Sequence, residues 1–457
     1  MKKYILLWVL MSLWCVPVWG LAPTNTPAPV KNVIWVIADG MGPEIMGFFM
    51  EGVRYANLEG YPEHVSSMEK MIQQGTQGLF FNKTYDTIVT DSAASGTQMA
   101  TGQYSRPDYI GIDYNQNKVQ TILELAQEKG KSIGVISDAY VTDATPAAFT
   151  AHVRSRRMKE QIAEQQIELG VDVISGGGLK YFNKDLLAKA KAKGYTLVKN
   201  RTELAKVKQG KLLALFSETG MPMAIEMYKH PNTPVLAEQT QKALELLEQN
   251  PEGFFLMVEA GKVDWAAHAN DPGSLLAEMK VLDATLKTVM EYADQHPNTL
   301  VYLNADHDTG LGSFVYQYLN SQKVAEKTKQ GEVLYNGNTA YHPLSRYKEL
   351  EKQKRSLYYV SQELYATPDS MLTRDYVERR LGETMGMQVD LSGIQDFKDI
   401  DGVLKYINKQ RGFAWATGTH SAAPIIGVAY GPHAELFSGV YHNTDIFPRM
   451  KKALGWE

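Results

Sequence analysis

Length, composition and charge place this chain among globular proteins. Its 457 residues are 44% hydrophobic and 21% charged, which excludes a disordered or fibrous chain. The 47 basic and 51 acidic residues give a net charge of −4, so the charge balance carries no nucleic-acid-binding signature. A chain of this length can bury a large core in one big domain or in two ordinary ones.

The first twenty residues have the pattern of a secretory signal peptide. Two lysines precede an apolar stretch, Tyr4–Val16, and small residues follow near Gly20. The stretch is shorter than the about 20 residues that span a bilayer, so cleavage is favoured over a retained anchor and no membrane span is expected afterwards. We predict an exported protein, periplasmic or secreted, with a signal peptide at 1–20 and a flexible lead-in at 21–30. The single cysteine, Cys15, would be removed, so stability would depend on core burial and bound metals.

Short apolar runs after residue 30 are typical of buried parallel strands. They are Val33–Ala38, Ile133–Ser137, Asp172–Ser175, Leu212–Phe216, Phe254–Val258, Leu300–Asn304 and Pro424–Ala429. Helical patterns lie between them at Thr121–Lys129, Glu238–Gln249 and Ser274–Gln295. This alternation predicts an α/β fold over residues 31–457, with a mostly parallel central sheet flanked by helices.

The stretch from about Gly312 to Arg411 interrupts this alternation. It is rich in Lys, Gln and Tyr, and it contains a helical pattern at Ser370–Met385. Neither of its ends has the composition of a linker. We therefore expect an insertion or cap at 312–411 between two elements of the sheet.

Residues 90–102 are small, polar and nearly uncharged, with Asp91 beside Ser92. They follow an extended-looking run, Tyr85–Val89, and Ala93–Met99 is expected to open a helix. Ser92 would then lie near the positive end of a helix dipole, where an anion is stabilised. No histidine is close in sequence to act as its base, so a metal ion is the expected agent if Ser92 is a nucleophile.

Metal-ligand side chains occur where the predicted strands end, and ligands of open α/β sheets bind beyond the carboxyl ends of strands. They are Asp39, Asp138, Asp143, Glu259, Asp264, His268, Asp306, His307, Asp308 and, before the last run, His420. Each one alone fits a turn or a helix cap. Together these residues lie at five predicted strands, and five such positions at one rim indicate a metal centre. Mixed Asp, Glu and His ligands suit zinc, and an all-oxygen set suits magnesium.

The order of these motifs resembles the alkaline phosphatase family of metal-dependent phosphomonoesterases. The matching blocks are Ile37–Gly42, Thr90–Ala94, Asp143–Ala147, Asp172–Gly178, Val258–Glu259, Asp264–His268, Ala305–His307, His420 and Ala429–Pro432. They occur in family order and span nearly all of the chain after the lead-in. The resemblance implies that phosphate monoesters are hydrolysed to alcohol and phosphate through a phosphoserine at Ser92.

Carried over position by position, the resemblance implies two zinc ions and one magnesium ion. The first zinc would be held by Asp264, His268 and His420, and the second by Asp39, Ser92, Asp306 and His307. The magnesium would be held by Asp39, Thr145 and Glu259, with Asp143 and Trp265 at positions that tune this third site. Arg156 matches the arginine that binds phosphate, with Arg154 and Arg157 as rivals.

Two other functions stay open at this point. A phosphodiesterase of the same superfamily would more often have threonine where Ser92 stands. A noncatalytic, metal-stabilised phosphate-binding protein would keep the fold, although decayed enzymes usually lose ligands. The expected partners are small-molecule phosphate monoesters, and the resemblance also implies a homodimer.

Overall fold

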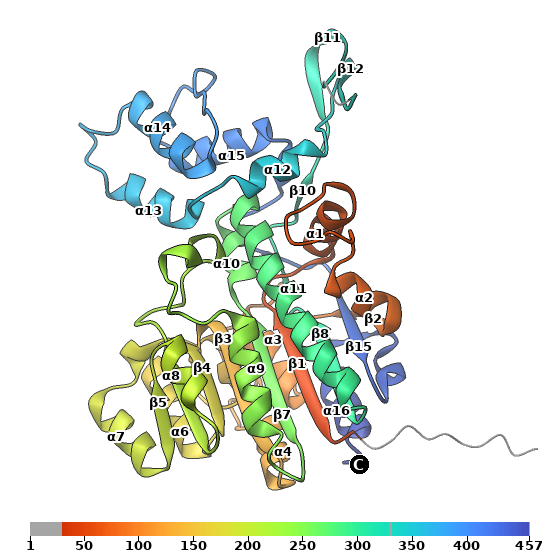
Figure 1. Cartoon of the computed structure of the whole chain (residues 1–457), viewed down its shortest axis with the longest axis vertical. Coiled ribbons are helices and arrows are strands. Elements are labelled where there is room, and N and C mark those ends of the chain that lie inside the picture. Colours follow the sequence, from red (N-terminus) through yellow and green to blue (C-terminus); the bar gives the residue numbers. More distant parts are fainter. Residues whose placement is uncertain (1–29, 329–330, 457) are drawn as a thin grey trace, which may run out of the picture.

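The centre of the molecule is a ten-stranded sheet (Figure 1). The structure is a computed structural model that describes residues 30–328 and 331–456. In spatial order the strands are β16 (Gly439–His442), β2 (Thr76–Phe81), β15 (Ile425–Tyr430), β8 (Thr299–Asn304), β1 (Asn32–Ala38), β7 (Phe254–Ala260), β3 (Ser132–Tyr140), β4 (Val173–Gly177), β6 (Lys211–Leu215) and β5 (Tyr195–Val198). Every residue of β1, β7 and β8 is buried, as expected for strands covered on both faces.

All neighbouring strands of this sheet are parallel except β15, which is antiparallel to both β2 and β8. The mostly parallel α/β fold is thus confirmed, but the prediction of a parallel strand at 424–429 is wrong. The chain leaves β8 at one rim and returns to that rim without a crossover to the opposite one, so β15 must run backwards. The start of β15 therefore lies where the parallel strands end.

Three strands of this sheet, β2, β5 and β16, were not predicted from the sequence. Two of them are the four-residue edge strands of the sheet, and β5 exposes its two central residues, so no apolar run marks it. The extended run expected at Tyr85–Val89 is wrong, because these residues form bends. Ile88 and Val89 there are 79% and 40% exposed, so their apolar character does not indicate a buried strand.

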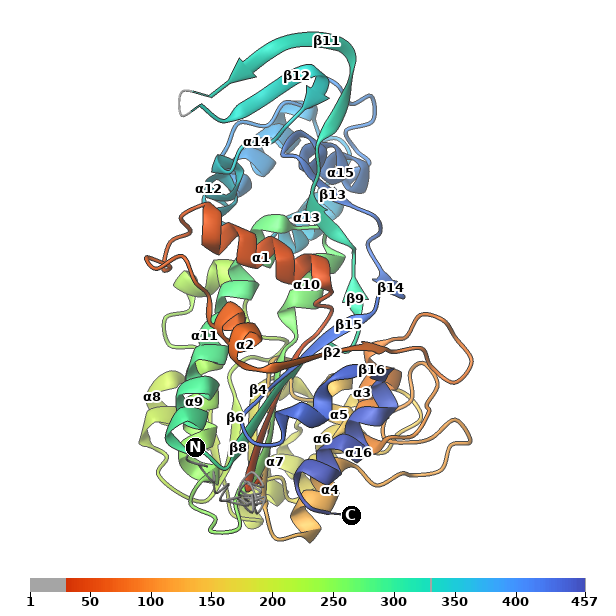
Figure 2. The same ribbon diagram turned by 90° about the vertical axis from the view of Figure 1, so that its right-hand side faces the viewer.

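Helices cover both faces of the sheet (Figure 2). On one face lie α2 (Ser67–Gln74), α8 (Arg201–Lys206), α9 (Leu236–Leu247) and α11 (Pro272–Gln295), and on the other α3 (Ser92–Thr101), α4 (Ile122–Glu128), α5 (Ala144–Ala148), α6 (Lys159–Leu169) and α16 (Ile446–Ala453). The remaining elements of this body are α1 (Pro43–Tyr55), α7 (Lys184–Ala192), α10 (Lys262–His268), η1 (Leu179–Tyr181), η2 (Ala224–Lys229), η3 (Ala434–Phe437) and η4 (Asn443–Asp445). The helices expected around residues 121, 238 and 274 are present as α4, α9 and α11.

The 312–411 region stands beyond one end of the sheet, at the top of Figures 1 and 2. It contains β10 (Gly312–Phe314), β11 (Gln317–Lys327), β12 (Val333–Ala340), α12 (Ser345–Glu351), α13 (Leu357–Ala366), α14 (Arg374–Met385) and α15 (Ile400–Gln410). Strand β10 pairs with β13 (Phe413–Trp415), which joins the two ends of the region. The helix expected from Ser370 begins later, at Arg374, because the Thr373 side chain caps it by accepting a hydrogen bond from the Tyr376 N–H.

The predicted signal peptide and all but the last residue of the predicted lead-in lie outside the described residues. In the parts of the chain that the structure describes, no helix combines the length and apolar character needed to cross a bilayer.

Candidate active site

The carboxyl ends of three adjacent strands bring the predicted ligands together. Asp39 follows β1, Glu259 lies near the end of β7, and Asp306 and His307 follow β8. Strand β1 lies between the other two in the sheet, and Ile37 pairs in register with both Glu259 and Asn304. These side chains therefore meet at one rim, as the sequence predicted.

Ser92 is the first residue of α3 and is only 2% exposed. Asp91 caps this helix by accepting a hydrogen bond from the Ala94 N–H at 3.0 Å, and its second carboxylate oxygen accepts one from the Asp108 N–H, also at 3.0 Å. The Ser92 Oγ lies 3.1 Å from His307 Nε2. A histidine thus contacts the serine after all, although 215 residues separate the two in sequence.

Asp39, Asp306 and His307 form a buried group that we call the inner cluster. His307 Nε2 lies 3.4 Å from Asp39 Oδ1 and 3.2 Å from Asp306 Oδ2, and the His307 side chain is 0% exposed. One Asp306 oxygen accepts hydrogen bonds from the Gly40 and His307 N–H groups. Asp39 Oδ1 and Asp306 Oδ2 have no hydrogen-bond partner. Buried carboxylate oxygens without donors are costly, and a cation between them would satisfy both.

Asp264, His268 and His420 form a second group nearer the surface, which we call the outer cluster. Helix α10 carries Asp264 and His268 one turn apart, with Asp264 Oδ2 3.3 Å from His268 Nε2. His268 Nε2 lies 3.1 Å from His420 Nε2. Each ring has its Nδ1 against a carbonyl oxygen, at 2.8 Å for Gly418 and 2.9 Å for Thr90. If both Nδ1 atoms donate, two Nε2 lone pairs face each other, which suits a shared metal ion.

Pairing between two short strands joins the clusters. Strand β9 (Asp308–Thr309) pairs with β14 (His420–Ser421), and the His307 and His420 rings stack with centroids 3.6 Å apart. Thr309 Oγ1 donates to Asp264 Oδ1 at 2.6 Å. Asp264, His307 and His420 consequently form a group with the spacing of metal ligands, as do Asp39, Asp306 and His307. His268 is not in the first group, and its side chain is 37% exposed.

Burial changes the protonation of the inner cluster. It raises the pKa of Asp39 well above its usual range, and the charges of Asp306, Asp264 and Glu259 act in the same direction. Burial likewise raises the pKa of Asp306 and of Glu259. It lowers the pKa of the His307 imidazole, which is therefore neutral and able to act as a ligand. Carboxylates crowded in this way ionise readily only beside a cation.

The residues assigned to the third ion lie beside the inner cluster. Thr145 is buried in α5, and the Glu259 carboxylate accepts a hydrogen bond from Ser137 Oγ. Asp143 caps α5, and its Oδ1 lies 3.0 Å from Lys159 Nζ. Trp265 packs its ring against Tyr140 and lies over Lys262 Nζ at 4.4 Å. Asp143 is therefore neutralised by a lysine from α6, a contact that no sequence signal indicated.

Arg156 is the one of the three candidate arginines that contacts the carboxylates beside Ser92. Its guanidinium lies 3.5 Å from Asp91 Oδ2 and 3.4 Å from Asp143 Oδ1. Arg154 is exposed, and the Arg157 side chain is 86% exposed beside Asp108. The two carboxylates hold Arg156 next to the serine, where it could bind a phosphoryl group.

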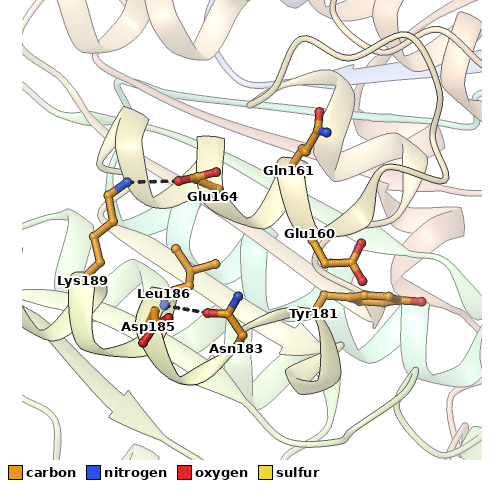
Figure 3. Close-up of a pocket in the computed structure, with 8 residues that line it drawn as sticks. All are labelled: Glu160, Gln161, Glu164, Tyr181, Asn183, Asp185, Leu186 and Lys189. Atoms are coloured by element: carbon orange, nitrogen blue, oxygen red, sulfur yellow. Dashed lines mark hydrogen bonds and ion pairs between the residues drawn. The ribbon is translucent and has the colours of Figure 1, made fainter.

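A separate pocket of about 250 Å³ lies between α6 and α7 (Figure 3). It is lined by Glu160, Gln161, Glu164, Tyr181, Asn183, Asp185, Leu186 and Lys189. None of these residues belongs to either cluster, and Lys189 is held by Glu164 at 3.3 Å. This pocket is distinct from the candidate active site.

The geometry of the site is typical of one class of protein. Neutral imidazoles and crowded carboxylates suit metal ions, and an arginine beside a serine at a helix N-terminus suits a phosphoryl group. The class is a metal-dependent phosphoryl hydrolase. A sequence profile of the alkaline phosphatase family matches residues 30–456. The chain belongs to the alkaline phosphatase family, and with it to the phosphoric monoester hydrolases.

Individual relatives agree with this assignment. Alkaline phosphatase 4 of Bacillus subtilis is 30% identical over 438 residues, covering 93% of this chain and 88% of the relative. The alkaline phosphatase of Escherichia coli is 32% identical, covering 95% and 88%. The crystal structure of a cold-active alkaline phosphatase from Shewanella sp. superposes with a TM-score of 0.75 at 29% identity, covering 93% of this chain and 99% of that one. The similarity thus extends over nearly the whole length of each relative.

Proposed function

We propose that the chain hydrolyses phosphate monoesters through a covalent phosphoserine at Ser92. The single observation that carries this proposal is the position of Ser92 Oγ, 3.1 Å from His307 Nε2 in a cluster where Asp39 Oδ1 and Asp306 Oδ2 lack hydrogen-bond donors. A serine in that position is beside a ready-made cation site and at a helix N-terminus. Both features favour its oxyanion and an approaching phosphate.

The residues present fit the metal ions that the family resemblance implies. We propose one zinc at Asp264, His268 and His420, a second at Asp39, Ser92, Asp306 and His307, and a magnesium at Asp39, Thr145 and Glu259. The mixed nitrogen and oxygen donors of the first two sets suit zinc, and the oxygen donors of the third set suit magnesium. Bound zinc would lower the pKa of the serine hydroxyl and of a water molecule, and would neutralise charge on the attacking and leaving oxygens.

The protein's own side chains then bind the phosphoryl group, orient it and accept it from the substrate. Arg156, held by Asp91 and Asp143, binds two non-bridging phosphate oxygens and orients phosphorus toward Ser92. Ser92 Oγ gives up its proton and forms a bond to phosphorus as the bond to the alcohol oxygen breaks, and that oxygen takes up a proton. A water molecule then attacks the phosphoserine, so that inorganic phosphate leaves and the serine regains its proton. An arginine that binds two free oxygens favours monoesters over diesters.

Turnover of p-nitrophenyl phosphate at alkaline pH tests this proposal. With zinc and magnesium present, the wild type should be active and Ser92→Ala should lose at least about 10³-fold in kcat. Ser438→Ala, at an exposed serine far from Ser92 in sequence, is the matched control and should keep full activity. Faster hydrolysis of bis-p-nitrophenyl phosphate than of the monoester would favour a phosphodiesterase. No turnover of either ester would leave a noncatalytic phosphate-binding protein.

Export is part of the same proposal. The apolar stretch near the N-terminus and the absence of cysteine after residue 15 favour a mature chain that works in the periplasm or outside the cell. N-terminal sequencing of the protein recovered from its producing cells should begin near residue 21. Recovery of the uncleaved chain in membranes would contradict this.

A further inference from the structure

A row of partly exposed aromatic side chains borders the candidate active site, and we call it the aromatic stripe. Its members, in order, are Tyr181, Tyr140, Trp265 and Tyr358. Successive ring centroids lie 5.8, 5.8 and 6.1 Å apart, within the range in which aromatic rings attract one another. The four side chains come from η1, the end of β3, α10 and α13, so the stripe exists only in the folded molecule.

The stripe is joined to the site at two points. Trp265 directly follows Asp264 of the outer cluster on α10. Lys159 Nζ lies 4.8 Å from the Tyr140 ring centroid and 3.0 Å from Asp143 Oδ1, the oxygen that Arg156 also contacts at 3.4 Å. The stripe therefore passes beside the residues assigned to phosphate and continues to the 312–411 region, to which Tyr358 belongs.

Tyr181 and Trp265 pack against the hydrophobic core with part of each side chain and leave another part exposed, and that open part is available to a ligand. Trp265 lies over the buried Lys262 and packs closely against Gly220. A Cβ atom added at Gly220 would lie 2.5 Å from the indole ring. These neighbours fix the orientation of the indole ring. A rigid aromatic surface stacks on a flat group at low entropic cost, and every nucleobase offers such a flat face.

We propose that the aromatic stripe is a subsite for the leaving group, and that it selects phosphate monoesters whose alcohol carries an aromatic ring, above all nucleoside monophosphates. The inference rests on the proposed function and adds a substrate class to it. Arg156 and Ser92 receive the phosphoryl group, and the base stacks on Trp265 and Tyr358. The 312–411 region thus takes part in substrate choice through Tyr358.

Two esters of the same primary alcohol test the inference. Adenosine 5′-monophosphate and ribose 5-phosphate differ in the base and not in the bond that is broken. The wild-type kcat/KM should be at least about five-fold higher for the nucleotide, the lower end of what stacking of one base provides. In the same protein, adenosine should inhibit hydrolysis of ribose 5-phosphate at a lower concentration than ribose does. Equal kcat/KM values, or equal inhibition, would overturn the subsite.

Substitutions in α13 test whether the Tyr358 ring causes the preference for the nucleotide. Tyr358→Leu should bring the two kcat/KM values within about two-fold by weakening only the nucleotide, whereas Tyr358→Phe should keep the preference because it keeps the ring. Tyr365→Leu, two turns further along α13 and 58% exposed, is the matched control and should change neither value. Equal loss on both esters in Tyr358→Leu would overturn the subsite but not the hydrolysis. No hydrolysis of either ester by the wild type would overturn both.

Discussion

The inner and outer clusters are built from the same residue types but differ in their access to water. The His307 side chain is 0% exposed, and the Asp306 side chain beside it is also 0% exposed. In the outer cluster, by contrast, His268 is 37% and His420 is 16% exposed. The inner cluster contacts the serine, whereas the outer cluster reaches the surface.

In the proposed mechanism, this difference gives each cluster a distinct role. Charges in a buried site act through a low dielectric, so the inner cluster is the better place to stabilise a serine oxyanion. A partly exposed site exchanges ligands easily, so the outer cluster is the better place for the leaving oxygen and the water that follows it. Three predictions test this difference between the two clusters.

Removing divalent metals should have the largest effect. Exhaustive chelation should abolish turnover, and added zinc with magnesium should restore it. It should also leave the protein with a stability that falls as pH rises. The folded pKa of Asp39 is raised, so above about pH 4 the folded state holds a proton that the unfolded chain has released, and the free energy of unfolding decreases with pH.

The lowered pKa of His307 acts in the opposite direction, but only below about pH 6.5, where the unfolded imidazole is protonated. Thermal melts of chelated protein should therefore show the decline without an opposing contribution from His307 once the pH exceeds about 6.5. Metal-loaded protein should show a flatter dependence, and chelated Asp39→Asn a smaller decline than the chelated wild type. Identical profiles with and without metal would show that no cation is bound between these carboxylates.

Single histidine substitutions in the two clusters should lower kcat to different extents. His307→Ala should lose about 10³-fold or more in kcat, because it removes a group that contacts Ser92. His268→Ala should lose about 10- to 100-fold and should recover in part when zinc is raised, because its site is open to solvent. His296→Ala, at the C-terminal end of α11, is the control and should be unchanged. Equal losses that zinc does not relieve would remove the distinction between the clusters.

Arginine variants should give the smallest effect of the three. Arg156→Met should raise KM about 10- to 30-fold, the contribution expected of charge-assisted hydrogen bonds to phosphate. Its neighbour Arg157, 86% exposed, provides the matched control, and Arg157→Met should leave KM unchanged. An unchanged kcat/KM for Arg156→Met would place the arginine outside the phosphate site.

Short segments of the chain predicted most of the parallel strands and the ligands at their ends. Asp39, Glu259, Asp306 and His307 each follow or end an apolar run, so their common rim follows from the direction of parallel strands. The sequence could not show contacts made by pairing of distant segments. The β9–β14 bridge stacks His307 on His420, and nothing local predicts it.

Two further misses have the same origin. The reversed direction of β15 depends on the path of the chain through the 312–411 region. The Lys159 contact to Asp143 depends on how α6 packs beside α5. Neither feature has a local signature in composition or periodicity.

Trapping of the covalent intermediate tests the central claim most directly. Protein mixed with a phosphate monoester, quenched in acid and digested, should yield one phosphorylated peptide, with the phosphoryl group on Ser92. The same peptide from Ser92→Ala should carry none. Phosphate on His307, on another residue or on no residue during active turnover would contradict a nucleophilic serine beside the inner cluster.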